Sequence, residues 1–224
     1  AGQTCRGASG RGAPGARRFV TDRLDRMLPD MLDALDDHAL MLRYGSDGDM
    51  AAFEALYGRY RGPLYRYLLR QCGDPDAAQD LYQEVWQRVI RSREDYRPTG
   101  KFSAWLFRVA HNCLADRARR AQRRPGDTWW QPLDETPVDG DERNPEEAAA
   151  MRETAARLRV AIDELSPEQR DAFLLHQESG LTLEEIGRVA GVGRETIKSR
   201  LRYAVARLRA RLSEADEALT GTHP

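Results

Sequence analysis

The fold is decided by residues 182–212, which read TLEEIGRVAGVGRETIKSRLRYAVARLRARL. Thr182 and Glu185 form a capping-box pattern, which predicts the start of a helix. Gly191 and Gly193 then suit a sharp turn between two helices. In the second helix a stripe of apolar residues at spacings of three and four is predicted to be buried: Ile197, Leu201, Ala204, Leu208 and Leu212. This order predicts a helix-turn-helix.

The outer face of that second helix is basic. Residues 194–211 contain seven basic residues and one acidic residue. A charged outer face is often only a solvated surface. Long basic side chains can nevertheless neutralise DNA phosphates, and Lys198 and Arg202 can reach base edges in the major groove. The pattern therefore favours DNA binding over a merely solvated helix.

Composition indicates an all-α protein without a catalytic centre. A chain of 224 residues with 32% charged and 41% hydrophobic residues allows one large domain or two small ones, and few alternating strand-like runs occur. Cys5, Cys72 and Cys113 have no paired or zinc-ligand spacing, so a reduced, cytoplasmic protein is expected. No apolar run approaches the length of a membrane span. The four histidines share no metal-ligand spacing and no phosphate-binding loop is present, so we expect no enzyme activity, cofactor or metal.

Two helices separated by Gly73, Asp74 and Pro75 are predicted between residues 49 and 91. Pro63 is expected to bend or restart the first helix, whereas Asp74 and Pro75 provide a cap and a first residue for the second. The second helix has a polar face with mixed charge: Asp80, Gln83, Glu84, Gln87 and Arg88. This face is either a solvated surface or a docking site for a partner.

Residues 101–124 are predicted to form a basic helix after a polar loop at residues 92–100. The helix segment carries seven basic residues and one acidic residue. Phe102, Trp105 and Phe107 are interleaved with this charge, an arrangement that suits stacking on single-stranded nucleic acid. Core packing is the other interpretation and is favoured for most of them. Periodicity alone leaves the choice open.

The sign of the charge reverses in residues 126–150, which contain eight acidic residues and one arginine together with three prolines and two glycines. We expect a linker here, with Trp129 and Trp130 packing on a neighbouring domain or a partner. A second domain is expected from about Met151, with a helix from Pro167 to about Gln177 capped by Ser166. Residues 1–18 are expected to be disordered.

In order, these motifs resemble the extracytoplasmic-function sigma factors of bacterial RNA polymerase. The resemblance covers about residues 49–212 and rests on residues 80–86 (DLYQEVW), on residues 102–112 (FSAWLFRVAHN) with Asp116 and Arg117, and on residues 165–170 (LSPEQR) before the helix-turn-helix. It implies an all-α fold of two small helical domains. The expected divisions are an N-terminal extension (1–45), sigma region 2 (46–125), an acidic linker (126–150), sigma region 4 (151–212) and a tail (213–224).

The resemblance also implies roles for particular residues. The β′ clamp of core RNA polymerase would be bound by Asp80, Gln83, Glu84 and Trp86. The minus-10 promoter element would be opened and read by residues 92–124, with DNA contacts from Asn112, Arg117, Arg119 and Arg120. The minus-35 element would be read by Arg194, Glu195, Thr196, Lys198, Ser199, Arg202 and Tyr203. Region 4 would face the β flap, the linker would thread the polymerase cleft, and family members are often held by an anti-sigma factor.

One departure from the family pattern and one rival interpretation accompany this prediction. Gly193 stands where the family often has a capping serine, which leaves the promoter preference undetermined. An ordinary helix-turn-helix regulator would share the appearance of residues 181–201. Such a regulator needs an effector or receiver domain, and residues 49–124 show no alternating strands or phosphoacceptor pattern for one.

Overall fold

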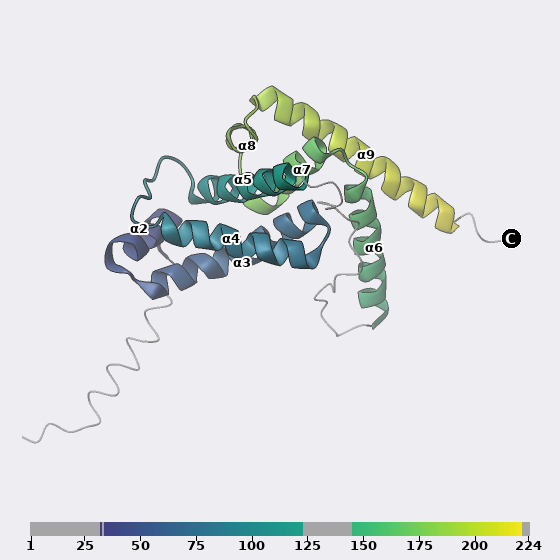
Figure 1. Cartoon of the computed structure of the whole chain (residues 1–224). Coiled ribbons are helices and arrows are strands. Elements are labelled where there is room, and N and C mark those ends of the chain that lie inside the picture. The colour runs from purple at the N-terminus through teal and green to yellow at the C-terminus, as the bar shows by residue number, and fades with distance from the viewer. Residues whose placement is uncertain (1–31, 33, 123–144, 221–224) are drawn as a thin grey trace, which may run out of the picture.

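The computed structural model describes residues 32, 34–122 and 145–220, and every regular element found there is a helix. The all-α prediction is therefore confirmed for this part of the chain. The elements are α2 (Asp37–Asp47), α3 (Met50–Cys72), α4 (Pro75–Arg91), α5 (Phe102–Gln122), α6 (Pro145–Asp163), α7 (Pro167–Ser179), α8 (Leu183–Ala190) and α9 (Arg194–Thr220). We call α2–α5 the N-terminal unit and α6–α9 the C-terminal unit (Figure 1).

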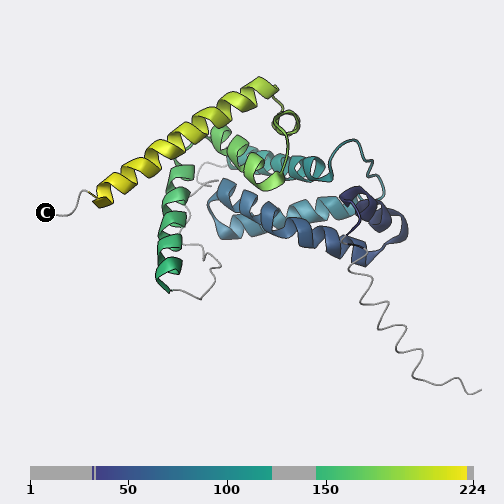
Figure 2. The same cartoon turned by 180° about the vertical axis from the view of Figure 1, so that it is seen from behind.

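The N-terminal unit is built on α3 and α4, which lie side by side in both Figure 1 and Figure 2. α5 packs on both of them, and α2 packs on α3. The expected bend or restart at Pro63 is not found as a break, because α3 runs through it without interruption. Pro63 removes one helical hydrogen bond, but Leu56 before it and Leu64 after it are both buried in the same core, at 1% and 0% exposure. Packing on either side thus keeps the helix continuous.

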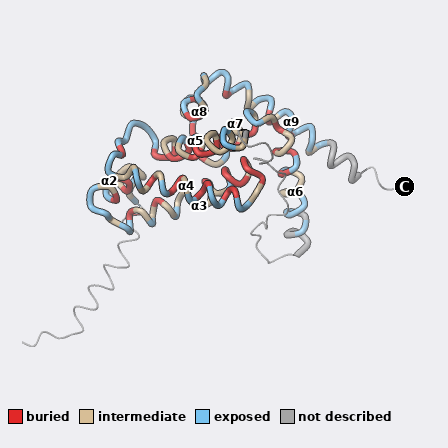
Figure 3. Tube along the Cα trace, in the orientation of Figure 1, coloured by how far each residue is buried: buried red, intermediate tan, exposed pale blue. Residues whose placement is uncertain are grey.

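The turn between α3 and α4 forms as its sequence predicts. Gly73 adopts the left-handed conformation with φ of 72° and ends α3. The Asp74 side chain accepts a hydrogen bond from the backbone N–H of Asp76 at 3.1 Å, and Pro75 is the first residue of α4. The burial map in Figure 3 shows the resulting core between α3, α4 and α5.

The C-terminal unit begins earlier and ends later than predicted. α6 starts at Pro145 rather than near Met151, because a proline at the first position followed by Glu146 and Glu147 favours a helix start. α9 continues past Leu212 to Thr220, since no glycine or proline occurs before Gly221. The remainder of the predicted linker, including Trp129 and Trp130, and the segment before Leu32 lie outside the described residues.

The connection from α6 to α7 is held by a buried arginine. Ser166 caps α7 by accepting a hydrogen bond from the Gln169 N–H at 3.3 Å, which confirms the predicted start. Arg170 is only 5% exposed and donates to the carbonyls of Ile162 at 3.3 Å and Leu165 at 3.4 Å. The Ile162 carbonyl lies in the last turn of α6 and also accepts from the Leu165 N–H at 3.1 Å, whereas Leu165 lies in the connection between α6 and α7. Within the described ranges, no helix is long and apolar enough to cross a membrane.

Candidate nucleic-acid interface

The helix-turn-helix is formed by α8, a three-residue turn and α9. Thr182 Oγ1 accepts from the Glu185 N–H at 3.3 Å, and Glu185 Oε2 accepts from the Thr182 N–H at 2.8 Å, so the predicted capping box is complete. Gly191 ends α8 in the left-handed conformation with φ of 68°. The Val192 N–H then donates to the Gly187 carbonyl at 2.9 Å and closes the turn.

The turn needs a second glycine that sequence analysis did not single out. A Cβ at Gly187 would lie 2.6 Å from the carbonyl oxygen of Val192, which is closer than non-bonded atoms tolerate. Gly187 is therefore fixed by the close approach of the turn to α8. A lone glycine inside a helical pattern carries no signal for this role, because the partner backbone is defined only by the fold.

The two faces of α9 separate as predicted. Ile197, Ala204 and Leu208 are buried on the side of α9 that packs on the other helices of the C-terminal unit, whereas Leu201 and Leu212, also predicted to be buried, are half-buried. The outward face consists of exposed residues that include every residue predicted to read the minus-35 element: Arg194, Glu195, Thr196, Lys198, Ser199, Arg202 and Tyr203. Such a face on the second helix of a helix-turn-helix is available to enter a DNA groove.

The charges on the outward face of α9 are partly paired. Arg194 Nε lies 2.6 Å from Glu184 Oε1, and Arg194 Nη1 lies 2.8 Å from Glu195 Oε1. Lys198 Nζ is 3.8 Å from Glu195 Oε2. Arg202 stacks over the Tyr203 ring at 5.0 Å, which leaves its guanidinium exposed and oriented for planar hydrogen bonding. Lys198 and Arg202 are both exposed and available to phosphates or guanine edges.

A second basic surface lies on α5. Asn112, Arg119 and Arg120 are exposed there, as a DNA contact would require. Arg117 is half-buried, and its Nε is enclosed without a hydrogen-bond partner among the described residues. Phe102 and Phe107 are fully buried at 1% and 0% exposure, so core packing is confirmed for both rings.

An ion-pair network joins this surface to α4. Arg88 Nη2 lies 2.6 Å from Glu84 and 3.1 Å from Asp116, and Arg119 also pairs with Asp116. Arg120 Nη2 reaches to 3.9 Å from Glu84. The hydrogen bonds from Arg119 and Arg88 lower the pKa of the Asp116 carboxyl below its usual value. The network holds the basic residues of α5 in register with α4.

The predicted polymerase-binding residues of α4 divide into two environments. Asp80 and Gln83 are exposed, and Glu84 is half-buried within the network. Trp86 is only 5% exposed and packs against Phe53 and Tyr57, with ring centroids 5.7 Å and 5.0 Å apart. A direct contact of the Trp86 ring with a partner would require this aromatic core to open, so its role in the present structure is to pack α3 against α4.

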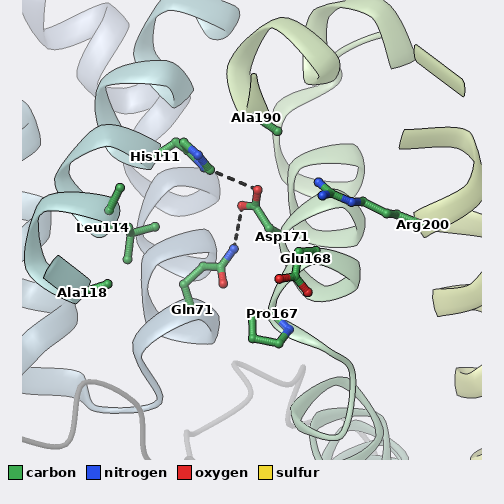
Figure 4. A pocket seen from close by; sticks show the side chains of 10 residues that line it. Gln71, His111, Leu114, Ala118, Pro167, Glu168, Asp171, Ala190 and Arg200 are labelled. Atoms are coloured by element: carbon green, nitrogen blue, oxygen red, sulfur yellow. Dashed lines mark hydrogen bonds and ion pairs between the residues drawn. The ribbon is translucent and has the colours of Figure 1, made fainter. Parts of the chain in front are cut away.

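The two units meet at Asp171 of α7. Asp171 Oδ1 accepts hydrogen bonds from Tyr67 Oη and from Gln71 Nε2, both at 2.8 Å, and Oδ2 lies 3.4 Å from His111 Nδ1. Figure 4 shows Asp171 pointing from the C-terminal unit toward Gln71 and His111. The hydrogen bond to Asp171 raises the pKa of His111 despite the opposing effect of burial. No local sequence pattern could have revealed this cluster.

A cavity of about 270 Å³ adjoins this cluster between the units. Its apolar wall comes mainly from α5, and Glu168 and Arg200 contribute charge from the opposite side (Figure 4). Beyond the cavity, Arg66 pairs with Glu178 at 2.8 Å, and Lys101 Nζ lies 3.1 Å from Glu185 Oε2. The second pair joins the start of the α5 region to the first helix of the helix-turn-helix.

Other reactive side chains in the described ranges are enclosed. Burial raises the pKa of the Cys72 thiol to about 12 and that of Cys113 to about 11. Both thiols are therefore protonated near neutral pH and behave as small core residues. Within residues 32, 34–122 and 145–220, no three histidine, cysteine or carboxylate side chains are placed together to hold a metal ion.

Two segments of the chain match known protein families. Residues 56–124 match Sigma-70 region 2, and residues 161–210 match Sigma-70, region 4. The first segment contains α4 and α5, and the second contains α7, α8 and most of α9. α2 lies outside both matched segments.

Curated proteins of similar sequence extend the comparison to both segments together. The ECF RNA polymerase sigma factor SigE of Mycolicibacterium smegmatis is 33% identical over 183 residues, which cover 80% of this chain and 70% of that protein. The ECF RNA polymerase sigma factor SigL of Mycobacterium tuberculosis is 33% identical over 171 residues, which cover 74% of this chain and 92% of that protein. The ECF RNA polymerase sigma factor ShbA of Streptomyces griseus is 34% identical over 171 residues, which cover 73% of this chain and 89% of that protein.

Solved structures show the same fold. The sigma factor RpoE of Bartonella quintana, crystallised with the anti-sigma factor NepR, has a TM-score of 0.57 at 22% identity and covers 72% of this chain and 96% of its own. The structure of CnrH in complex with the cytosolic domain of CnrY has a TM-score of 0.54 at 22% identity. The match covers 80% of this chain and 99% of the CnrH chain. At this level of identity the likeness concerns the fold alone.

Proposed function

Because the chain belongs to the extracytoplasmic-function sigma factors of bacterial RNA polymerase, we propose that it binds core polymerase and directs transcription initiation at promoters with two elements. The observation that carries the proposal is the outward face of α9, on which all seven predicted minus-35 residues are exposed while Ile197, Ala204 and Leu208 of the apolar stripe are buried. A basic surface on α5 supplies a second reading site in the other unit.

We infer that the minus-10 element is read by α5 and the loop before it. Asn112, Arg119 and Arg120 are exposed, and the network with α4 includes Arg119 through Asp116 and Arg120 through Glu84. Asparagine and arginine can hydrogen-bond base edges and phosphates, and unstacked bases of the non-template strand can be captured by such groups. Arg117 is the weaker candidate because its Nε is enclosed.

We infer that the exposed part of α4 binds the polymerase. Asp80 and Gln83 present a polar surface to the β′ clamp, Glu84 supports it through Arg88, and Trp86 stabilises it from within. The C-terminal unit would lie on the β flap. The chain contributes no bond-making chemistry, which remains with the polymerase, and it works in the cytoplasm where that enzyme and DNA are found.

We infer that the units move apart when both elements are read at once. The Lys101–Glu185 contact of 3.1 Å brings the α5 region against the helix-turn-helix, whereas two sites read by separate helices on one duplex are about 34 Å or more apart. The stretch of residues 123–144 can span roughly 75 Å when fully extended. Joining two weak reading sites through such a segment raises their combined affinity.

A crossed promoter experiment tests the assignment of the two sites. Transcription by core polymerase with each variant is measured on promoters substituted in either element. Arg202→Ala is expected to remove discrimination at the minus-35 element by roughly 5- to 100-fold and to leave minus-10 discrimination intact, and Asn112→Ala the reverse. Arg207→Ala is the matched control, since it removes an exposed charge from a different side of α9.

The crossed result separates the proposal from its rival. If Arg202→Ala and Arg207→Ala weakened transcription equally on every promoter, α9 would act only through general charge. An ordinary helix-turn-helix regulator would bind DNA without core polymerase and would direct no new starts. Either result would refute the site assignment.

A further inference from the structure

The loop at residues 92–100, which is assigned to promoter reading, is held by few hydrogen bonds of its own among the described residues. Its early part turns back on α4, with the Asp95 N–H donating to the Ser92 carbonyl at 3.2 Å. Among the described residues, Arg97 donates to carbonyls of the same loop, those of Glu94 and Tyr96. The position of such a loop depends on what its side chains and backbone touch outside it.

Tyr96 is the anchor of this loop. It is 4% exposed, and its ring lies 5.0 Å from that of Trp105 and 6.0 Å from that of Phe102, both on the first turn of α5. On its other side the Tyr96 hydroxyl makes a 2.6 Å hydrogen bond with His38 Nδ1 of α2, and the two rings stack with 6.0 Å between centroids. Tyr96 therefore connects α2 directly to the start of α5.

α2 also contacts the backbone of the loop. A Cβ at Gly45 would lie 2.4 Å from the Arg93 carbonyl oxygen, so only glycine permits the observed approach. The Arg93 guanidinium lies 5.8 Å from the centroid of the Tyr44 ring. α2 thus contacts the loop at residues 93 and 96 through His38, Tyr44 and Gly45.

α2 is itself fixed to the core rather than to the loop alone. Asp36 caps its first turn by accepting from the Ala39 N–H at 2.7 Å, and Asp37 pairs with Arg59 of α3 at 2.7 Å. Leu40 and Met41 are completely buried. A helix held this firmly can set the position of a loop that leans on it.

We propose that α2 is a positioning element for minus-10 recognition, in which His38 and Gly45 set the loop at residues 92–100 and, through Tyr96, the first turn of α5. The inference rests on the proposed function, since it deepens the assignment of this loop to the minus-10 element. It concerns a helix outside both matched family segments, so it assigns a role to a part of the chain that the family comparison leaves open.

The first test measures the loop in the free, full-length protein by hydrogen–deuterium exchange. His38→Ala and Tyr96→Phe are expected to speed amide exchange in residues 93–100 by roughly tenfold, the size expected from losing one hydrogen bond, while α4 and α7 remain unchanged. His38→Asn places a polar atom near the position of Nδ1 and should restore slow exchange. Leu42→Ala is the matched control, because Leu42 is 45% exposed on the same helix.

The second test measures promoter discrimination by core polymerase with the same variants. His38→Ala is expected to reduce discrimination among minus-10 substitutions severalfold and to leave minus-35 discrimination unchanged, with recovery in His38→Asn. A general loss of folding would lower transcription on all promoters alike and would not be rescued. If His38→Ala fails to fold, Tyr96→Phe, which removes one oxygen atom, decides the question.

The outcomes of these tests distinguish the positioning role of α2 from the proposed sigma-factor function on which it rests. Unchanged loop exchange, or a looser loop with unchanged minus-10 discrimination, would overturn the positioning role while leaving the sigma assignment intact. A wild-type protein that directs no minus-10-dependent starts would overturn the proposed function and the positioning role together.

Discussion

At the scale of single residues, Asp171 has the largest number of partners from the other unit. Its carboxylate accepts hydrogen bonds from Tyr67 and Gln71, which are 0% and 6% exposed, and also pairs with His111. Buried donors need acceptors, because leaving one unpaired costs about 1–3 kcal/mol. Asp171 therefore contributes to the contact between units chiefly by satisfying groups that the N-terminal unit has already buried.

Replacing Asp171 should accordingly destabilise the protein. Asp171→Ala is expected to lower the free energy of unfolding by about 1–3 kcal/mol, measured by urea denaturation. Asp171→Asn retains an acceptor oxygen and should lose less. Glu168→Ala, an exposed neighbour one turn earlier on α7, should change the value by less than about 0.5 kcal/mol. Equal losses in Asp171→Ala and Glu168→Ala would show that the buried hydrogen bonds are unimportant.

His111 makes the contact dependent on pH. Its hydrogen bond to Asp171 raises its pKa above the ordinary value of 6.5, so the protonated ring is favoured in the folded state. The stabilisation is therefore complete below the ordinary pKa and is lost as the pH rises through the raised value. The difference in unfolding free energy between wild type and His111→Gln should therefore shrink as the pH rises from below 6.5 through the raised pKa of His111. A difference that grows with pH would contradict the assignment.

At the scale of elements, helix starts and stops followed from short motifs. Thr182 with Glu185, Ser166 with Gln169, and Asp74 with Pro75 each formed the cap that its residues predicted. Such signals are local, since donor and acceptor lie within a few residues of each other. Pro63 and the start of α6 were predicted less well, because packing of Leu56 and Leu64 kept α3 intact and a run read as linker contained its own helix start.

The glycines of the helix-turn-helix allow a matched prediction. Gly187→Ala should lower the free energy of unfolding by about 1–3 kcal/mol, because its Cβ would meet the Val192 carbonyl at 2.6 Å. At Gly193 a Cβ meets nothing within 4 Å. Gly193 immediately precedes α9, so Gly193→Ser should cap the helix and gain a few tenths of a kcal/mol. Thermal and urea unfolding of the two variants measure the predicted loss of stability in Gly187→Ala and the predicted gain in Gly193→Ser. A Gly187→Ala variant as stable as the wild type would show that the turn tolerates a Cβ at this position.

At the scale of the whole molecule, the sequence predicted the elements better than their mutual arrangement. The basic faces of α5 and α9 were visible as periodic charge, and their exposure agrees with that pattern. The pairing of Asp171 with Tyr67, Gln71 and His111, and that of Lys101 with Glu185, joins residues far apart in the chain. No spacing rule connects such positions. The burial of Trp86 in an aromatic cluster was missed for the same reason, because its partners Phe53 and Tyr57 lie on another helix.

We propose that this one chain carries two DNA-reading surfaces, on α5 and α9, that act together on core polymerase. The most direct measurement maps transcription starts made by purified core RNA polymerase, with and without the protein, on fragments of the genome that encodes it. We expect new, protein-dependent starts that share two elements at a fixed separation. A protein that binds DNA by itself, does not bind core polymerase and creates no new starts would contradict this proposal.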